Sequence, residues 1–245
     1  MRRAVLLSFF AFASCLAGKA QVANVEDSLN WGLVSSQQVE QFTTQAALGN
    51  SSSLYALGRC YFNGFGIGKD RYKAAECYAK AAEKDHTQAL YYLGFCYKFG
   101  YGVTKDDVKA NRYFEKAIKW LEKEQDNDSY ALYYLALCYG NGFGVEKDVN
   151  SSLELYDKAI AMGNTQAMVA LANDYLVGNN VKMDQAKAVQ LFQQAAEKGN
   201  PVAQLSLGYC YLDGMGVAVD KEKAKMLFQN AADQGLDAAK KALNF

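Results

Sequence analysis

Hydrophobic and polar positions along the chain repeat at a nearly constant interval. Five segments open with a leucine that a tyrosine follows four positions later, and these leucines are Leu57, Leu93, Leu135, Leu171 and Leu207. Their spacings are 36, 42, 36 and 36 residues. Because residues i and i+4 share one face of a helix, each opening predicts a helix with a core stripe of Leu and Tyr. A fixed period of this size predicts a solenoid of stacked repeats.

A turn follows each of these first helices. Four copies carry a Gly-x-Gly element, as at Gly64 and Gly66, whereas the fourth copy has Gly178 and Asn180 in its place. Both residue types tolerate positive φ, which predicts a turn in every copy. An aspartate then stands in register in each copy and is predicted to cap a second helix: Asp70, Asp106, Asp148, Asp184 and Asp220.

The second helix has a stripe of small, aromatic and small residues at spacings of four and three. Its members are Ala74, Tyr78, Ala81; Ala110, Phe114, Ala117; Ser152, Tyr156, Ala159; Ala188, Phe192, Ala195; and Ala224, Phe228, Ala231. The spacing keeps each set on one face, so the ring is predicted to fill the gap between repeats. Glycines beside three opening leucines (Gly58, Gly94, Gly208) predict close approach of a neighbouring helix. Gly163, Gly199 and Gly235 are predicted to end second helices.

The pattern LGxxYxxGxGV…D…KAxx[WYF]xxKAA…G resembles the Sel-1-like repeat, a relative of the tetratricopeptide repeat, in five copies over residues 51–235. The resemblance implies an all-α fold, a right-handed α/α superhelical solenoid of about five helix-turn-helix repeats with partial caps. Residues 21–50 and 236–245 are interpreted as an N-terminal and a C-terminal cap helix. Six residues inserted before the third copy, near residues 120–130, are expected to lengthen a helix end and its loop and to be charged and exposed.

The first 20 residues have the pattern of a signal peptide. A basic start precedes an apolar run at residues 4–17, and small residues at Gly18 and Ala20 stand before a new N-terminus at Gln21. The run is short for a bilayer span, although an uncleaved anchor is an alternative. A lipid anchor at Cys15 is the weaker alternative. No later segment reaches membrane-spanning length. From the signal-peptide pattern we expect the chain to be exported, periplasmic or secreted.

The charge balance bears on whether the chain binds nucleic acid, and the cysteine positions bear on whether it forms disulfides. The chain balances 26 basic against 26 acidic residues, and removal of Arg2, Arg3 and Lys19 leaves 23 against 26, a net charge of −3. This balance argues against nucleic acid, whose phosphates need a basic stripe. Four cysteines share one repeat column and are expected to be buried thiols: Cys60, Cys96, Cys138 and Cys210. A Cys60–Cys77 disulfide within one hairpin is an alternative.

Catalytic, cofactor and metal motifs are not found in the sequence. His86 is the only histidine, and we expect it to be an exposed loop residue because a lone histidine supplies a single ligand. The stretch from Gly64 to Lys69 lacks the first glycine and the Ser/Thr of a phosphate-binding loop. The acidic run at 122–128 lacks the glycine and ligand spacing of a calcium loop. We therefore expect a protein that is not an enzyme, with no cofactor and no metal.

The resemblance also implies where a partner would bind. First helices of tetratricopeptide-like repeats line a concave groove, and the matching positions here are Tyr55, Arg59, Phe62, Tyr91, Phe95, Phe99, Tyr133, Leu137 and Tyr209. An exposed aromatic surface is typical of binding sites. The alternative is that these rings pack against adjacent first helices as core. The sequence thus favours an exported scaffold or adaptor for a protein or peptide; the alternatives are an envelope-acting hydrolase and a structural assembly subunit.

Overall fold

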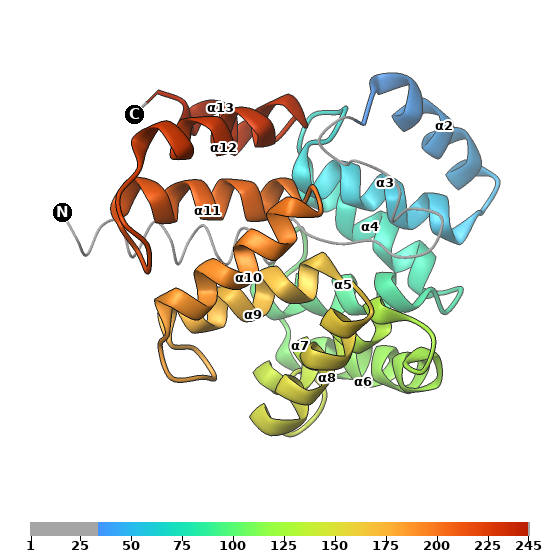
Figure 1. Cartoon of the computed structure of the whole chain (residues 1–245). Coiled ribbons are helices and arrows are strands. Elements are labelled where there is room, and N and C mark those ends of the chain that lie inside the picture. The colour runs from blue at the N-terminus through green and yellow to red at the C-terminus, as the bar shows by residue number, and fades with distance from the viewer. Residues whose placement is uncertain (1–33, 245) are drawn as a thin grey trace. The chain divides into compact units, whose positions relative to one another are not determined.

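The computed structural model describes residues 34–244, so the predicted signal peptide of residues 1–20 and Cys15 lie outside the described residues. Within residues 34–244 the chain forms twelve helices and no strand (Figure 1). The helices are α2 (Ser36–Ala47), α3 (Ser51–Asn63), α4 (Arg71–Ala82), α5 (Thr87–Phe99), α6 (Asp107–Glu124), α7 (Ser129–Asn141), α8 (Val149–Ala161), α9 (Thr165–Val177), α10 (Gln185–Glu197), α11 (Pro201–Asp213), α12 (Lys221–Asp233) and α13 (Asp237–Ala242). The all-α prediction is confirmed.

Contacts between residues group the described chain into two units. One unit comprises residues 34–159 and the other residues 160–244. In the first unit, consecutive helices from α2 to α7 pack against one another in sequence order. In the second unit, α9 packs on α10, α10 on α11, α11 on α12, and α12 on α13. Each unit is therefore built by local packing between neighbours along the chain, as expected for repeats.

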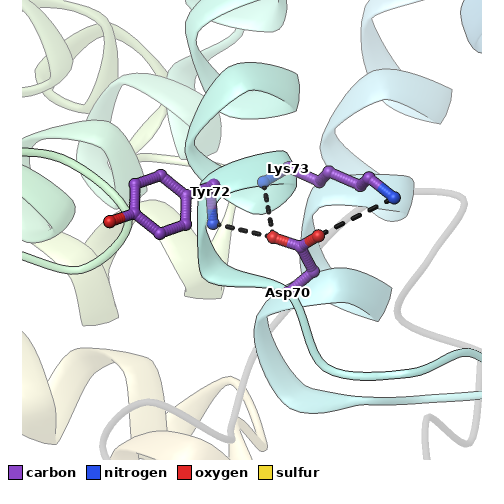
Figure 2. A network of polar contacts seen from close by, with 3 residues as sticks. All are labelled: Asp70, Tyr72 and Lys73. Atoms are coloured by element: carbon purple, nitrogen blue, oxygen red, sulfur yellow. Dashed lines mark hydrogen bonds and ion pairs between the residues drawn. The ribbon is translucent and has the colours of Figure 1, made fainter.

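Each second helix begins at the aspartate predicted from the sequence. In the first repeat, Asp70 Oδ1 accepts hydrogen bonds from the backbone N–H groups of Tyr72 and Lys73, both at 3.1 Å (Figure 2). The other four carboxylates accept equivalent bonds in α6, α8, α10 and α12 at 2.9–3.1 Å. These bonds satisfy N–H groups that the first helical turn leaves without partners. The N-cap predictions are confirmed.

The turn before each second helix has one backbone geometry in all five copies. Gly64 and Gly66 have φ of 85° and 64°, and Asn180 takes a positive φ of 60° in the fourth copy. The aspartate N–H then donates back to the carbonyl of the repeat tyrosine, at 2.9 Å for Asp70 and Tyr61 and at 2.9–3.0 Å in the other copies. Positive φ is accessible to glycine and asparagine at little steric cost, so the turn prediction is confirmed.

The glycines beside the opening leucines allow the rings of the second helices to approach. A Cβ at Gly94 would lie 3.0 Å from the Phe114 ring, and a Cβ at Gly208 would lie 2.5 Å from the Phe228 ring. In the third copy, where Ala136 replaces the glycine, Ser152 Oγ donates to the Ala136 carbonyl at 2.7 Å. The small–aromatic–small stripes are buried in all five repeats. Close helix approach is thus confirmed, with the ring of the partner helix filling the space.

The recurring tyrosines differ from the prediction of a Leu and Tyr core stripe. All five opening leucines are buried, but four of the five tyrosines, Tyr61, Tyr97, Tyr139 and Tyr175, are only half-buried. In four repeats a lysine three residues after the capping aspartate lies over the tyrosine ring, at 4.4 Å for Lys223 over Tyr211 and up to 5.4 Å elsewhere. The tyrosine therefore links the two helices of one hairpin at the surface through a cation–π contact.

The inserted residues before the third repeat lengthen α6 to 18 residues, against 12 or 13 in the other second helices. Glu122, Lys123 and Glu124 are exposed on the added turns, and Leu121 is buried. A longer helix end with a charged, exposed surface was the expectation, and it is confirmed.

The five described cysteines are buried. Cys77 is a free thiol, so the alternative of a Cys60–Cys77 disulfide is wrong in this structure. Burial raises the pKa of Cys77 to about 11 and the pKa of Cys96 to about 12, because a thiolate is poorly solvated there. The buried thiols behave as small apolar groups, as predicted for the four cysteines that directly precede a repeat tyrosine.

Candidate partner-binding surface

The nine predicted groove residues divide by position in the helix. The residues two before the opening leucine are core: Tyr55, Tyr91 and Tyr133 are at most 5% exposed. Of the four residues two after it, Phe95, Leu137 and Tyr209 are half-buried, whereas Arg59 is completely buried. Phe62 is buried, and Phe99 is 46% exposed. Phe95, Phe99 and Leu137 in the unit of residues 34–159, and Tyr209 in the unit of residues 160–244, are therefore accessible, and the other five residues are buried.

The buried tyrosines pack between repeats. The ring of Tyr91 on α5 lies 5.5 Å from Phe114 on α6 and 4.8 Å from Tyr134 on α7, measured between ring centroids. These rings from α6 and α7 cover Tyr91, which is 5% exposed. Burial raises the pKa of Tyr91 well above its usual value. Tyr91 is a packing residue in this structure.

Arg59 is completely buried within the same cluster of rings. Its Nη1 donates to the Tyr55 hydroxyl at 3.1 Å, and its guanidinium carbon lies 5.2 Å from the centre of the Tyr92 ring. A buried guanidinium needs hydrogen bonds and aromatic faces around it, because burial removes the water that would otherwise solvate its charge. The surroundings make Arg59 part of the core rather than a residue presented to a partner.

Three aromatic residues form the accessible surface at the end of α5, and we call Phe95, Phe99 and Tyr101 the Phe99 patch. The rings of Phe95 and Phe99 lie 4.5 Å apart, and Tyr101 stacks on Phe99 at 5.9 Å with an interplanar angle of 25°. The guanidinium of Arg71, at the start of α4, lies 4.1 Å from the Tyr101 ring centre. The patch combines exposed apolar area with one cation held by aromatic stacking.

Tyr101 was not among the residues predicted for the groove. It occupies the middle position of the Gly100–Gly102 turn, and the equivalent residues in the first and third repeats are Phe65 and Phe143. Phe143 stacks on Phe114 at 4.8 Å and lies 6.3 Å from Phe99. The aromatic residue between the two glycines was the available signal, because three successive copies carry one.

His86 differs from the expected exposed loop residue. It is the N-cap of α5, half-buried, and its Nδ1 accepts a hydrogen bond from the Ala89 N–H at 3.4 Å. Its ring stacks on Tyr55 at 4.9 Å between centroids. Burial lowers the pKa of His86 to about 4. The expectation was wrong because His86 occupies the N-cap position of a first helix, where the other copies carry Asn50, Asp128, Asn164 and Asn200.

Within residues 34–244, no group of three or more His, Cys, Asp or Glu side chains is placed to hold a metal ion. In the same range, no helix combines the length and the apolar character needed to cross a bilayer.

Comparison with known protein families assigns the repeats of this chain to one family. The family model of the Sel1 repeat matches residues 51–86, 87–123, 129–164, 165–200 and 201–236. The chain belongs to the Sel1 repeat family. Sel1 repeats generally act as non-enzymatic scaffolds for interactions between proteins. A search of the curated proteins gives no match.

Solved structures of Sel1 repeat proteins resemble this chain. A Sel1 repeat protein from Oxalobacter formigenes is 30% identical, with 85% of this chain and 80% of that chain covered and a TM-score of 0.49. A putative Sel1 repeat protein from Klebsiella pneumoniae is 21% identical, with coverage of 84% and 97% and a TM-score of 0.53. Immunity protein Pa5087 from Pseudomonas aeruginosa is 20% identical, with coverage of 94% and 82% and a TM-score of 0.53. The last two likenesses concern the fold.

Proposed function

We propose that this Sel1 repeat protein is an exported scaffold that binds a protein or peptide partner through the Phe99 patch. The observation that carries the proposal is the exposure of Phe99, a large apolar side chain that is 46% exposed beside the half-buried Phe95 and Tyr101. Clustered aromatic side chains at a surface are favourable binding sites, because they supply apolar area at little loss of conformational entropy. Binding of this kind needs no catalytic residue.

The patch is held in place before a partner arrives. Phe95 and Phe99 are one turn apart on α5, and the Tyr101 ring contacts them with centroids 5.8 and 5.9 Å away. Arg71 contacts Tyr101 from the start of α4. A surface whose side chains are already packed loses little entropy on binding, which favours affinity. The buried Tyr55, Arg59, Phe62, Tyr91 and Tyr133 support the scaffold and are not contacts in this proposal.

Site-specific photo-cross-linking in the source cell tests the binding claim. A photo-reactive phenylalanine analogue at Phe99 is expected to give a discrete adduct with one protein, and the same analogue at Met226 is the control. Met226 is an apolar residue on α12 that is 65% exposed and belongs to the other unit. The adduct should weaken when Phe95→Ala is added. Equal labelling from both positions, or no loss with Phe95→Ala, would contradict the proposal.

Export is the second part of the proposal, and it rests on the N-terminal sequence pattern. We expect mass spectrometry of the protein from fractionated cells to find a mature form that begins at Gln21 outside the cytoplasm. Replacement of Leu6 and Leu7 by Asp should leave the uncleaved chain in the cytoplasm. A full-length chain that remains cytoplasmic without this change would show that residues 1–20 are not a signal peptide, whatever the Phe99 patch binds.

A further inference from the structure

The outward face of α6 carries a line of four cations, and we call Arg112, Lys116, Lys119 and Lys123 the α6 ridge. All four are exposed. Their spacings of four, three and four residues place them on one side of the helix, opposite the buried Ala110, Phe114, Ala117, Ile118 and Leu121. The ridge extends from residue 112 to residue 123, or about 16 Å at the rise of an α-helix.

The repeat fold does not require this charge, because no other second helix has it. Counted from the capping aspartate, the residues equivalent to Arg112, Lys116 and Lys119 are Glu76, Lys80 and the C-cap Glu83 for α4; Glu154, Lys158, Ala161 in α8; Gln190, Gln194, Glu197 in α10; and Met226, Asn230, Asp233 in α12. The fourth cation, Lys123, lies in the six-residue insertion that lengthens α6. The insertion therefore adds one cation to this line, between the acidic Glu122 and Glu124, and only this repeat has such a line.

The cations of the ridge are not held in ion pairs within the described residues. Among residues 34–244, none of the four forms an ion pair, whereas Lys80 on α4 pairs with Glu76 at 2.8 Å. Arg112 and Lys116 stand at i and i+4, where like charges destabilise a helix slightly. On the α6 helix surface, Glu115 and Glu122 flank the line of cations on one side. Lys109 and Trp120 flank it on the opposite side. Four cations without ion pairs on one side of a helix fit an anionic surface.

Trp120 adds an aromatic side chain beside the charges. It is 38% exposed, and the Lys123 ammonium lies 4.5 Å from the centre of its ring. Tryptophan is favoured where water meets lipid headgroups, because its ring has an apolar body and one polar N–H. Lysine is depleted at protein–protein interfaces, but clustered lysines beside such a residue are typical of attachment to anionic lipid. The composition of the ridge therefore favours a membrane surface over an acidic protein.

From these observations we infer that α6 is a peripheral membrane-binding surface for anionic phospholipid. The four cations face the headgroup phosphates, and the Trp120 ring lies at the level of the headgroups. The apolar face of α6 remains in the protein core, so the attachment is electrostatic and reversible. Each cation removed should lower the partition coefficient about fivefold. This surface is distinct from the Phe99 patch, and its test does not depend on a protein partner.

Trp120 fluorescence provides a local readout on the chain from Gln21 onward, because the apolar run of residues 4–17 would itself bind vesicles. The chain has two tryptophans, so a Trp31→Phe background leaves Trp120 as the only one. Vesicles of phosphatidylcholine mixed with phosphatidylglycerol should shift its emission to the blue, and brominated lipid should quench it. Vesicles of phosphatidylcholine alone should do neither. The shift should disappear in high salt, because salt screens surface charges.

A charge-matched pair of variants completes the test. The ridge variant R112Q/K116Q/K119Q/K123Q should lose the shift on anionic vesicles. The control variant K182Q/K198Q/K221Q/K225Q removes the same number of exposed cations elsewhere and should keep it. Both should retain the wild-type circular dichroism spectrum and Tm. Equal shifts in the two variants, a shift on neutral vesicles, or no shift at all would overturn the inference. Saturable binding of polyglutamate without a vesicle response would also overturn it and would indicate an acidic protein partner.

Discussion

The ring of Tyr78 occupies the space that a side chain at Gly58 would need, since a Cβ there would lie 2.6 Å from Tyr78 Cε1. Gly58 is on α3 and Tyr78 is on α4, so this contact sets how closely the two helices of the first hairpin approach. Tyr78 is completely buried and cannot move aside without disturbing other rings, such as Tyr55 and Tyr92. Protein interiors are packed too densely to absorb such an overlap freely.

We therefore expect Gly58→Ala to lower the free energy of unfolding by about 1–3 kcal/mol, the usual range for overpacking. The loss should occur even though alanine is the better helix former by about 1 kcal/mol. Urea denaturation followed by circular dichroism measures it. Gly68→Ala is the control, because a Cβ at this exposed glycine meets no atom within 4 Å. A Gly58→Ala protein as stable as wild type would show that the hairpin can widen.

Tyr91 and Phe99 are both on α5 and should respond very differently to truncation. Tyr91→Ala removes a ring buried against Phe114 and Tyr134 and is expected to lower the free energy of unfolding by about 3–5 kcal/mol. Phe99→Ala should lower it by less than about 1 kcal/mol, because nearly half of the side chain is already in water. Thermal unfolding of the two variants makes the comparison. Similar losses would show that Phe99 is also a core residue.

The carboxylate of Asp70 should stabilise α4 through its two hydrogen bonds to backbone N–H groups. Asp70→Ala is expected to lower the free energy of unfolding by about 1 kcal/mol. Asp70→Asn keeps an oxygen acceptor of the same geometry and should be close to wild type. Urea denaturation at neutral pH distinguishes the variants. If the two substitutions lose stability equally, the charge of Asp70 is the important feature and not the cap.

His86 should make stability depend on pH. Its pKa is about 4 in the folded protein and about 6.5 in an unfolded chain. The unfolded state therefore binds the proton first, so the contribution of His86 is complete above pH 6.5 and is lost as pH falls toward 4. The loss reaches up to about 3 kcal/mol, and protonation also removes the Nδ1 acceptor that caps α5.

Urea denaturation at pH 7 and pH 5 checks this for wild type and for His86→Asn. Asparagine caps the equivalent helices at Asn50, Asn164 and Asn200, so the variant should keep the cap without a titrating group. We expect the stability difference between the two pH values to be smaller in the variant. An unchanged difference would assign the pH dependence to other groups.

Local features of the repeat could be predicted because each depends on only a few neighbouring residues. The N-caps at Asp70 and Asp106, the positive φ at Asn180 and the close approach at Gly94 follow from residue type and spacing alone. The cap at His86 could have been predicted from the column of asparagines at the same position. The extension of α6 also followed from the sequence, since six additional residues must lengthen some element between two fixed repeat positions.

The sequence by itself determined the helices, their caps and turns and the order in which they stack, because these depend on hydrogen bonds and side-chain spacing along the chain. Only the tertiary structure decided which face of each first helix is accessible. Tyr91 and Phe95 are separated by four residues and both are aromatic, yet the first is buried and the second half-exposed. Their difference arises from the rings that other helices bring against them, such as Phe114 and Tyr134, and spacing within α5 carries no information about those rings.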